Sequence, residues 1–232
     1  SNSMTTYAEL TQQILDYTET DTNVLTSTIT DDFIEHAELQ IFRQLDSDAF
    51  RKYKTAPMTS GDPFIATPGA TPQTFDYVRS LTIFSASGSL GGLTDAERIV
   101  LIRKDQTFMS EYWPNRSSTG IPKYYSNWDN DTLIVAPTPN AAYTIELAYV
   151  AQPTGLSSSN TTTWIGNNAP SVLLYACLIE AFKFLKNPEM LAMYTQQYQG
   201  AIQVLASEQM GFRRRDENRD GAVRMPIPSG NP

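Results

Sequence analysis

The chain contains one histidine and one cysteine, His36 and Cys177, which limits the chemistry available to it. His36 is predicted on a helix next to Glu35, and general-base catalysis would need an orienting partner that the sequence does not indicate. Cys177 lies in the most apolar stretch of the chain, where a thiol behaves as a small hydrophobic side chain. A zinc site is excluded by this composition, and the lack of any intrachain disulfide suits a reducing compartment.

Two short motifs resemble ligand-binding loops but lack their full spacing. Asp129, Asn130 and Asp131 are not followed by the glycine and the distal glutamate of a calcium loop, so they predict a tight turn. The glycines at 88, 91 and 92 are not followed by the lysine and hydroxyl residue of a phosphate-binding loop. A pair of acids for glycoside hydrolysis remains an open alternative among 25 carboxylates, none of which stands out. We predict no catalytic residue, cofactor or metal, and no enzyme activity.

Aromatic residues are concentrated in the middle of the chain and have two interpretations. They fill a small β core, which is the favoured interpretation because such rings suit half-buried strands, or they form a platform for a carbohydrate. The second interpretation predicts that two tryptophans lie exposed and side by side. The two tryptophans are Trp113 and Trp128, and the whole aromatic set is Tyr112, Trp113, Tyr124, Tyr125 and Trp128.

The strongest surface signal is a cluster of arginines within the last 20 residues. It holds five of the 17 basic residues of the chain, and interleaved acids weaken a nucleic-acid interpretation. Arginines suit the negative end of a helix dipole, and they also pair with carboxylates of a partner. We favour docking on a partner by these residues, which are Arg213, Arg214, Arg215, Arg219 and Arg224.

Helices are predicted at both ends of the chain. Residues 6–17 begin with a capping box of Thr6 and Glu9, and a second helix is predicted to start near Thr28 or Thr30, with Asp31 and Asp32 at its positive end. Near the other end, residues 168–186 form a helix that is apolar all round and must be buried, with Asn168 as its cap and Pro170 in its first turn. Asn187 and Pro188 then start a last helix, which is predicted to end at Phe212.

Between these helices, residues 50–165 are rich in prolines, β-branched residues and turn signals, which predicts an antiparallel β region. Residues 51–59 and 64–67 are predicted to form a hairpin around Gly61. Further strands are predicted at 77–84, 99–102 and 142–150, with a second hairpin at 123–136 and a short helix at 105–113 capped by Asp105.

The expected fold class is α+β: a helical bundle built from N- and C-terminal helices with an inserted antiparallel β region. We expect a single domain over 4–212, with helices at 5–47 and 168–212, and a flexible docking tail over 213–232. Ser1-Asn2-Ser3 is typical of an expression-tag remnant and is left out of the fold. The net charge of −8 argues against sequence-specific DNA binding. No stretch is apolar enough to cross a membrane.

Four stretches of the sequence resemble the head–tail adaptor (connector) proteins of tailed double-stranded DNA bacteriophages. They are YAELTQQILDYTE, DDFIEHAELQIFRQL, TGIPKYYSNWDNDTLIVAPTPN and TTTWIGNNAPSVLLYACLIEAFKFLK. The resemblance extends over residues 5–215, and its most specific part is the 128–139 hairpin together with residues 164–185. These motifs are structural and assign no role to single residues.

The resemblance implies a structural virion protein in the neck between capsid and tail, made in the host cytoplasm. Such adaptors form a ring beneath the portal, commonly of twelve copies, extend the DNA channel, and provide a platform for tail or nozzle proteins. The portal-facing element would be residues 211–224 with their arginines, and the tail-facing surface would lie among the β-region loops. DNA would pass through without sequence-specific binding, and the isolated chain is expected to be monomeric if the ring forms only on the portal.

Two alternatives remain open on the sequence. One is a different neck or tail-completion protein of a phage, which composition does not separate from an adaptor. The other is a carbohydrate-binding module that uses the aromatic β region. The ring's copy number and the tail type of the phage are not determined by the sequence.

Overall fold

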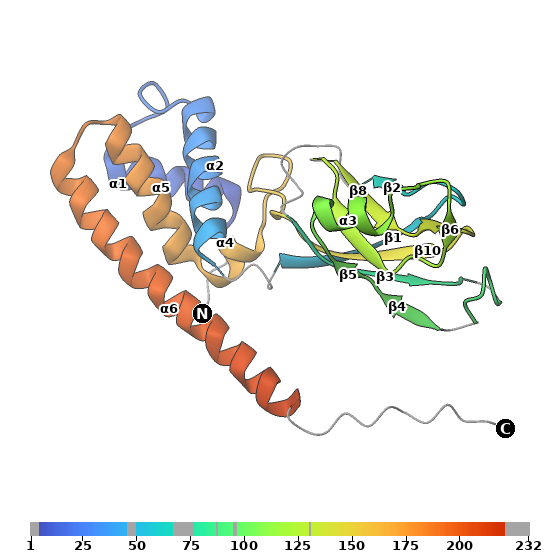
Figure 1. The fold of residues 1–232 in the computed structure, drawn as a ribbon. Helices are drawn as coiled ribbons and strands as arrows, with labels where there is room; N and C mark the ends of the chain where they lie inside the picture. The colour runs from blue at the N-terminus through green and yellow to red at the C-terminus, as the bar shows by residue number, and fades with distance from the viewer. Residues whose placement is uncertain are drawn as a thin grey trace. The chain divides into compact units, whose positions relative to one another are not determined.

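The computed structural model describes residues 5–45, 50–66, 77–86, 88–94, 97–129 and 131–220. It is an α+β structure, as predicted, and it divides into two compact units (Figure 1). The helical unit combines the two ends of the chain, residues 1–47 and 154–232, and the β unit consists of residues 48–153.

The helical unit is built around one helix that contacts all the others of the unit. This helix is α5 (Pro170–Phe184), and it packs against α1, α2, α4 and α6. Eight of its residues are buried, among them Leu173, Cys177 and Leu178, which have no exposed surface. The surrounding helices are α1 (Tyr7–Thr18), α2 (Ser27–Gln44), α4 (Trp164–Asn168) and α6 (Pro188–Asp220).

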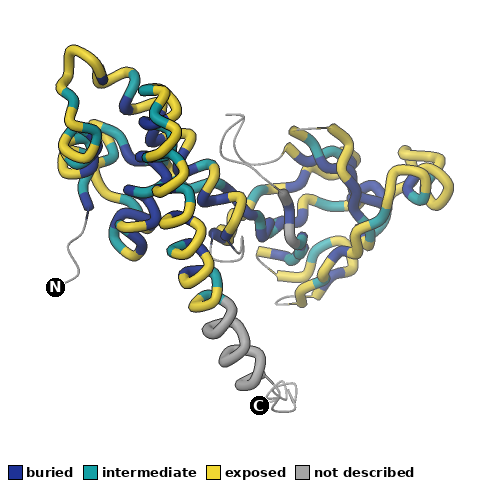
Figure 2. Tube along the Cα trace, turned by 90° about the vertical axis from the view of Figure 1, so that its left-hand side faces the viewer, coloured by how far each residue is buried: buried dark blue, intermediate teal, exposed yellow. Residues whose placement is uncertain are grey.

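The buried stripes of these helices follow the predicted spacing. Leu10 and Ile14 of α1, and Ile34, Ala37 and Ile41 of α2, are buried. On α6 the buried side chains recur every three or four residues, while most of the other residues up to position 209 are exposed or partly exposed (Figure 2). The buried residues of α6 are Tyr194, Tyr198, Ile202 and Leu205.

Capping explains where several helices begin, and it corrects two predictions. The Thr6–Glu9 capping box is present, and the Asn187 side chain accepts from the Met190 N–H at 3.2 Å. However, α2 begins at Ser27, so Asp31 and Asp32 lie beyond its first turn. Asn168 does not cap α5 but ends α4, where its amide donates to the Trp164 carbonyl at 2.9 Å. The spacing of apolar residues predicts these helices, but it does not determine the residue at which α2 and α5 begin.

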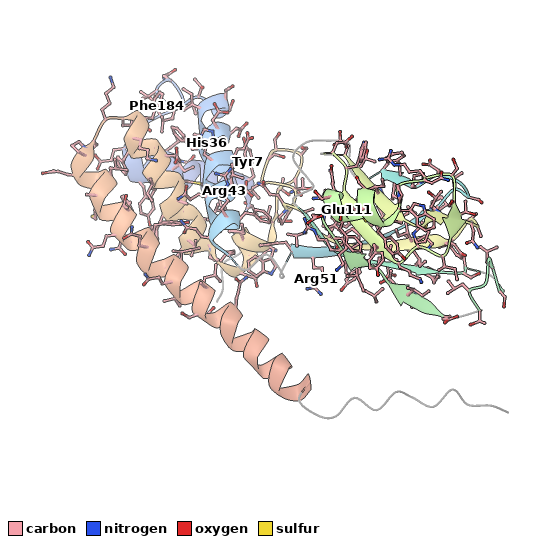
Figure 3. All side chains as sticks on the ribbon, viewed as in Figure 1. Tyr7, His36, Arg43, Arg51, Glu111 and Phe184 are labelled. Atoms are coloured by element: carbon pink, nitrogen blue, oxygen red, sulfur yellow. The ribbon has the colours of Figure 1, made fainter. Side chains whose placement is uncertain are left out.

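Polar contacts hold the two N-terminal helices together and fix the chain that returns from the β unit. The Tyr7 side chain lies toward α2 (Figure 3), and its hydroxyl donates to the Asp31 carboxylate at 2.6 Å. The returning segment is held by the buried Glu38 of α2, whose two carboxylate oxygens accept from the Leu156 N–H at 3.0 and 3.2 Å. A Cβ on Gly155 would lie 3.1 Å from the same carboxylate. Burial raises the pKa of Glu38 from 4.5 to about 7, although the Leu156 hydrogen bond lowers it.

The β unit contains two four-stranded sheets and one strand pair. In the first sheet the order is β1-β10-β3-β4, and all neighbours are antiparallel. In the second sheet the order is β2-β8-β7-β5, in which β5 pairs with β7 in parallel. The pair β6–β9 is also parallel, so the predicted antiparallel region contains two parallel pairings. The strands are β1 (Arg51–Pro57), β2 (Phe64–Ala66), β3 (Tyr77–Phe84), β4 (Arg98–Val100), β5 (Ile102–Arg103), β6 (Thr119–Gly120), β7 (Tyr124–Asn127), β8 (Thr132–Ala136), β9 (Thr138–Pro139) and β10 (Thr144–Val150).

A common core lies between these sheets. Side chains of β3, β8 and β10 meet there with those of the intervening loops, because alternate residues of a strand point to the same face. Its most enclosed members include Leu81, Ile83, Tyr143, Ile145 and Leu147. The short helix α3 (Gln106–Tyr112) is capped by Asp105, as predicted, and packs against β7.

The hairpin predicted around Gly61 is wrong. Gly61 does adopt a left-handed conformation, with φ of 82°, but β1 pairs with β10 and β2 pairs with β8. The turn therefore sends the chain from one sheet to the other. The single strand predicted at 99–102 is divided at Leu101 between β4 and β5, which belong to different sheets. The predicted hairpin of β7 and β8 and the strands β3 and β10 are confirmed.

We expect Glu38→Gln to flatten the pH dependence of stability. A carboxyl whose pKa is raised on folding binds more protons when folded, so its stabilising contribution is complete below pH 4.5 and is lost as the pH rises through about 7. The size of this loss is on the order of 2–3 kcal/mol. Urea unfolding measured from pH 4.5 to 8 checks it. The control Glu35→Gln, at an exposed position of the same helix, should retain most of the change in unfolding free energy with pH. The same pH dependence in both variants would show that Glu38 is not its source.

In the β unit, Gly91→Ala should destabilise the fold more than Gly88→Ala. Both glycines have positive φ, 58° and 65°, which costs a residue with a Cβ about 1–2 kcal/mol. Only at Gly91 would the Cβ also collide with the Tyr143 hydroxyl, and nothing lies within 4 Å at Gly88. We expect Gly91→Ala to lower the free energy of unfolding by about 3 kcal/mol and Gly88→Ala to lower it by about 1 kcal/mol. Urea unfolding measures both. Equal losses would show that the close approach to Tyr143 is unimportant.

Candidate functional site

The predicted docking arginines lie on a helix rather than beyond it. The last helix does not end at Phe212, because α6 continues through Asp220 and includes Arg213, Arg214, Arg215 and Arg219. Arg224 lies outside the described residues, as does the rest of the predicted tail beyond 220.

The charge of the helical unit is divided unevenly along its sequence. Outside the last 20 residues its basic residues are Arg43, Lys183 and Lys186, whereas the last 20 residues hold five arginines. Acidic residues dominate the rest of this unit, including Asp16, Glu19, Asp21, Asp31 and Asp32. The end of α6 is therefore a basic extension of an acidic helical unit.

A second candidate site is the small pocket beside α3 in the β unit. It has a volume of about 30 Å³, enough for about one water molecule. Met109, Trp113 and Ser110 of the α3 region, Trp128, and Ile134 and Ala136 of β8 are among its lining residues. The indole nitrogen of Trp113 is buried and has no hydrogen-bond partner among the described residues.

Cationic side chains cover the aromatic rings around this pocket. The Arg116 guanidinium lies 4.7 Å from the Trp128 ring centroid and 5.5 Å from that of Phe64. The Lys104 ammonium lies 4.8 Å from the Phe108 ring, which in turn stacks on Tyr112 at 5.5 Å. The Arg116 contacts are not predictable from the sequence, because they join residues that are distant along the chain.

The aromatic residues predicted as one set have different roles. Tyr125 is buried in the core, whereas Tyr112 and Trp128 are 40% and 42% exposed. Trp113 and Trp128 line the same pocket, but Trp113 is only partly exposed. A pocket of this volume is far below the several hundred Å³ typical of small-molecule sites, so it has no room for a sugar ring. The aromatic set is therefore divided between the core and a small surface cluster.

The two residues with the most reactive side chains have no catalytic surroundings. His36 is on the surface of α2 (Figure 3), with its Nδ1 atom 3.8 Å from the Glu180 carboxylate and 63% of its side chain exposed. The Cys177 side chain is fully buried, and burial raises the pKa of its thiol well above the ordinary value, as do the nearby Glu38 and Glu180 charges. Across the described parts of the chain, no group of three potential ligands could hold a metal ion.

The motifs that resembled ligand loops are turns. The Asp129 side chain accepts from the Asp131 N–H at 2.9 Å, which closes an Asx turn. The Gly91 carbonyl accepts from the Asn140 amide and from the Tyr143 hydroxyl at 3.0 and 3.1 Å, so it binds the protein's own side chains.

Glu38 is the polar residue that sequence reasoning overlooked. It lies four residues after Ile34, on the buried stripe of α2. An acid at such a position signals a buried carboxylate with a dedicated hydrogen-bond donor, and Leu156 supplies it.

The profile of the SU10 adaptor protein family matches residues 5–226. The chain belongs to this family of phage head–tail adaptors. It is thus a structural adaptor protein of the phage virion. No curated protein matches the chain. Within the described residues, no helix is both long and apolar enough to cross a membrane.

We expect Cys177 to be unreactive in the folded protein. The thiolate is the reactive form, and both burial and the raised thiol pKa suppress it. A thiol-specific colorimetric reagent should therefore modify less than about a tenth of the protein in the time that fully modifies unfolded chain in urea. Raising the pH from 7 to 8.5 should accelerate only the unfolded sample. Rapid modification of the folded protein would contradict the enclosed position of α5.

Proposed function

We propose that the chain forms a ring beneath the portal of the filled capsid, extends the DNA channel and provides the attachment platform for tail proteins. Membership in the adaptor family supports a virion role. The basic end of α6 on an otherwise acidic helical unit supports a specific docking element. This charge distribution is the observation that carries the proposal.

In this proposal Arg213, Arg214, Arg215 and Arg219 face the portal and pair with its carboxylates, and Arg224 extends the same surface. A guanidinium binds a carboxylate through two parallel hydrogen bonds, which fixes orientation as well as affinity. The rest of the helical unit contributes mainly negative charge, which repels the DNA backbone and lets DNA pass without binding. Copies placed side by side around a closed ring use two different surfaces of each chain.

The β unit supplies the tail-facing surface in this arrangement. Its loops and the exposed residues around α3 include Tyr112 and Trp128, and aromatic residues are enriched at protein interfaces. A different neck or tail-completion role makes the alternative prediction that the chain co-purifies with tail components and does not bind isolated portal. Imaging of the purified protein mixed with portal assemblies separates the two roles.

Reversing charge at the end of α6 should abolish assembly on the portal. We expect Arg213→Glu combined with Arg214→Glu to weaken binding to purified portal assemblies at least 100-fold, because each attraction becomes a repulsion. Lys52→Glu with Lys54→Glu makes the same change of charge on the exposed strand β1 and should bind like the native protein. Surface plasmon resonance at two salt concentrations measures both variants, since binding by exposed charges weakens with salt.

A second comparison separates charge from geometry. Arginine-to-lysine changes at 213 and 214 retain the charge but lose the bidentate fork, so we expect an intermediate loss of about tenfold. Native affinity in the charge-reversed variant would refute the portal assignment of these arginines.

A further inference from the structure

The helix α6 carries no charge over about five of its turns. No charged residue stands between Glu189 and Glu208, although this part of α6 packs mainly on α5 and exposes its other sides (Figure 2). The solvent-facing side of a helix is ordinarily polar and charged. The helices α1 and α2 follow that rule, since they expose Asp16, Asp31 and Asp32. The uncharged side of α6 is therefore suited to something other than water.

Four exposed residues of this stretch lie on one side of the helix. They are spaced by four, three and four positions, which keeps them in line along a helix. Met193 and Val204, at the two ends of this line, are 42% and 60% exposed. Apolar residues at this spacing are the anchors by which a helix contacts another protein. The outer face of α6 consists of Met193, Gln197, Gly200 and Val204.

Gly200 is the member of this face that the fold of a single copy does not require. Glycine in the interior of a helix is less stable than alanine. A Cβ added to Gly200 would meet nothing within 4 Å, so no neighbour within the chain excludes a side chain there. Glycine does allow another backbone to approach closely. Its position in the middle of the outer face therefore favours a second helix that crosses α6 at Gly200.

A groove lies on a different side of α6, between this helix and α2. Its volume is about 250 Å³, just below the range typical of small-molecule sites. Ile179 of α5 contributes apolar surface, whereas Gln40 of α2 and Gln199 of α6 contribute exposed amides. The charged residues of the lining are Glu180 and Lys183, which pair with each other at 3.3 Å. The groove is thus suited to uncharged side chains of another protein.

We propose that these two surfaces meet in adjacent copies, so that the outer face of α6 of one copy lies in the groove between α2 and α6 of the next. The Met193 side chain enters the groove, and Gln197 exchanges hydrogen bonds with Gln40, since a side-chain amide both donates and accepts. Gln199 lies about 150° around α6 from the outer face, at ~100° per residue. The contact therefore joins two different surfaces, as a ring requires. The inference rests on the proposed function, because it names the surfaces by which the copies of the ring touch.

Charge identifies the occupant of the groove as a second copy of the chain. The exposed acids of α1 and α2 make two copies repel each other across those helices. The outer face of α6 carries no charge, and in the groove the Glu180 and Lys183 charges oppose each other. Neither surface suits DNA, because binding to its phosphates depends on lysine or arginine. Two acidic copies therefore approach each other most favourably through these two surfaces.

Disulfide trapping tests which surfaces meet. Copies carrying Met193→Cys are mixed with copies carrying Gln40→Cys and oxidised, both as concentrated isolated protein and on purified portal assemblies. We expect a linked dimer from this mixture, and none when Ala8→Cys, at an exposed position of α1, replaces the Gln40 variant. The native Cys177 is buried and does not compete. Linkage of two Met193→Cys copies to each other instead would overturn the groove assignment.

The two samples separate this contact from the portal role. A dimer on the portal alone supports the contact, because the portal raises the local concentration of copies. Rings imaged on the portal without the dimer overturn the contact and leave the ring intact. A dimer in the isolated protein, without assembly on the portal, refutes the portal role and retains the contact. No dimer in either sample refutes the contact.

Gly200→Glu, introduced into the Met193→Cys copies, should block the contact without harming the fold. Nothing lies within 4 Å of the added Cβ, and glutamate is a better helix former than glycine. Thermal unfolding should therefore occur at the native temperature or above it. We expect the yield of linked dimer to fall at least tenfold, because a charged side chain replaces a close approach. Ala8→Glu adds the same charge on α1 and should leave the yield unchanged. A native yield from the Gly200 variant would refute the assigned face.

Discussion

The enclosure of α5 is the constraint on which the helical unit depends. A 15-residue helix with eight buried apolar residues is stable in water only when other elements cover these residues, since exposed apolar surface is unfavourable. Neither end of the chain supplies enough cover alone: α1 and α2 come from the N-terminal end, and α4 and α6 come from the C-terminal end. The chain therefore leaves this unit after residue 47, forms the β unit, and returns at residue 154.

The returning segment is fixed by polar contacts as well as by the burial of Leu156. Glu38 holds the Leu156 N–H, and backbone bonds join Tyr7 to Thr161 at 3.0 Å and Thr5 to Gly166 at 3.1 Å. A Cβ on Gly166 would lie 2.7 Å from the Thr5 carbonyl oxygen, so the backbones approach too closely for a side chain. A buried carboxylate is costly, and the hydrogen bond from the Leu156 N–H, a donor that would otherwise be buried alone, reduces this cost only in part, since the pKa of Glu38 remains raised.

The parts of the fold that depend on local signals are predictable from the sequence. The Thr6 capping box, the Asn187–Pro188 start of α6, the strand β3 and the β7–β8 hairpin all arise from neighbouring residues. Strand partners are not predictable in this way, because β1 pairs with β10 although the paired residues, from Pro57↔Thr144 to Arg51↔Val150, lie 87 to 99 positions apart. Gly61 shows the difference: its turn was predicted from its residues, but the sheet that each flanking strand joins depends on distant chain. Among the candidate sites, the arginines were evident from composition, whereas the Arg116 stacking and the buried Trp113 N–H depend on tertiary contacts.

The strand β1 lies at one edge of its sheet, and this position affects the tendency of the chain to aggregate. Among the described strands it pairs with β10 alone, and its residues from Arg51 to Thr55 are exposed. A free strand edge is a template on which another chain adds by backbone hydrogen bonding, and charged side chains, lysine above all, discourage that addition. Lys52 and Lys54 on this strand therefore oppose the addition of another chain to the edge of the β unit.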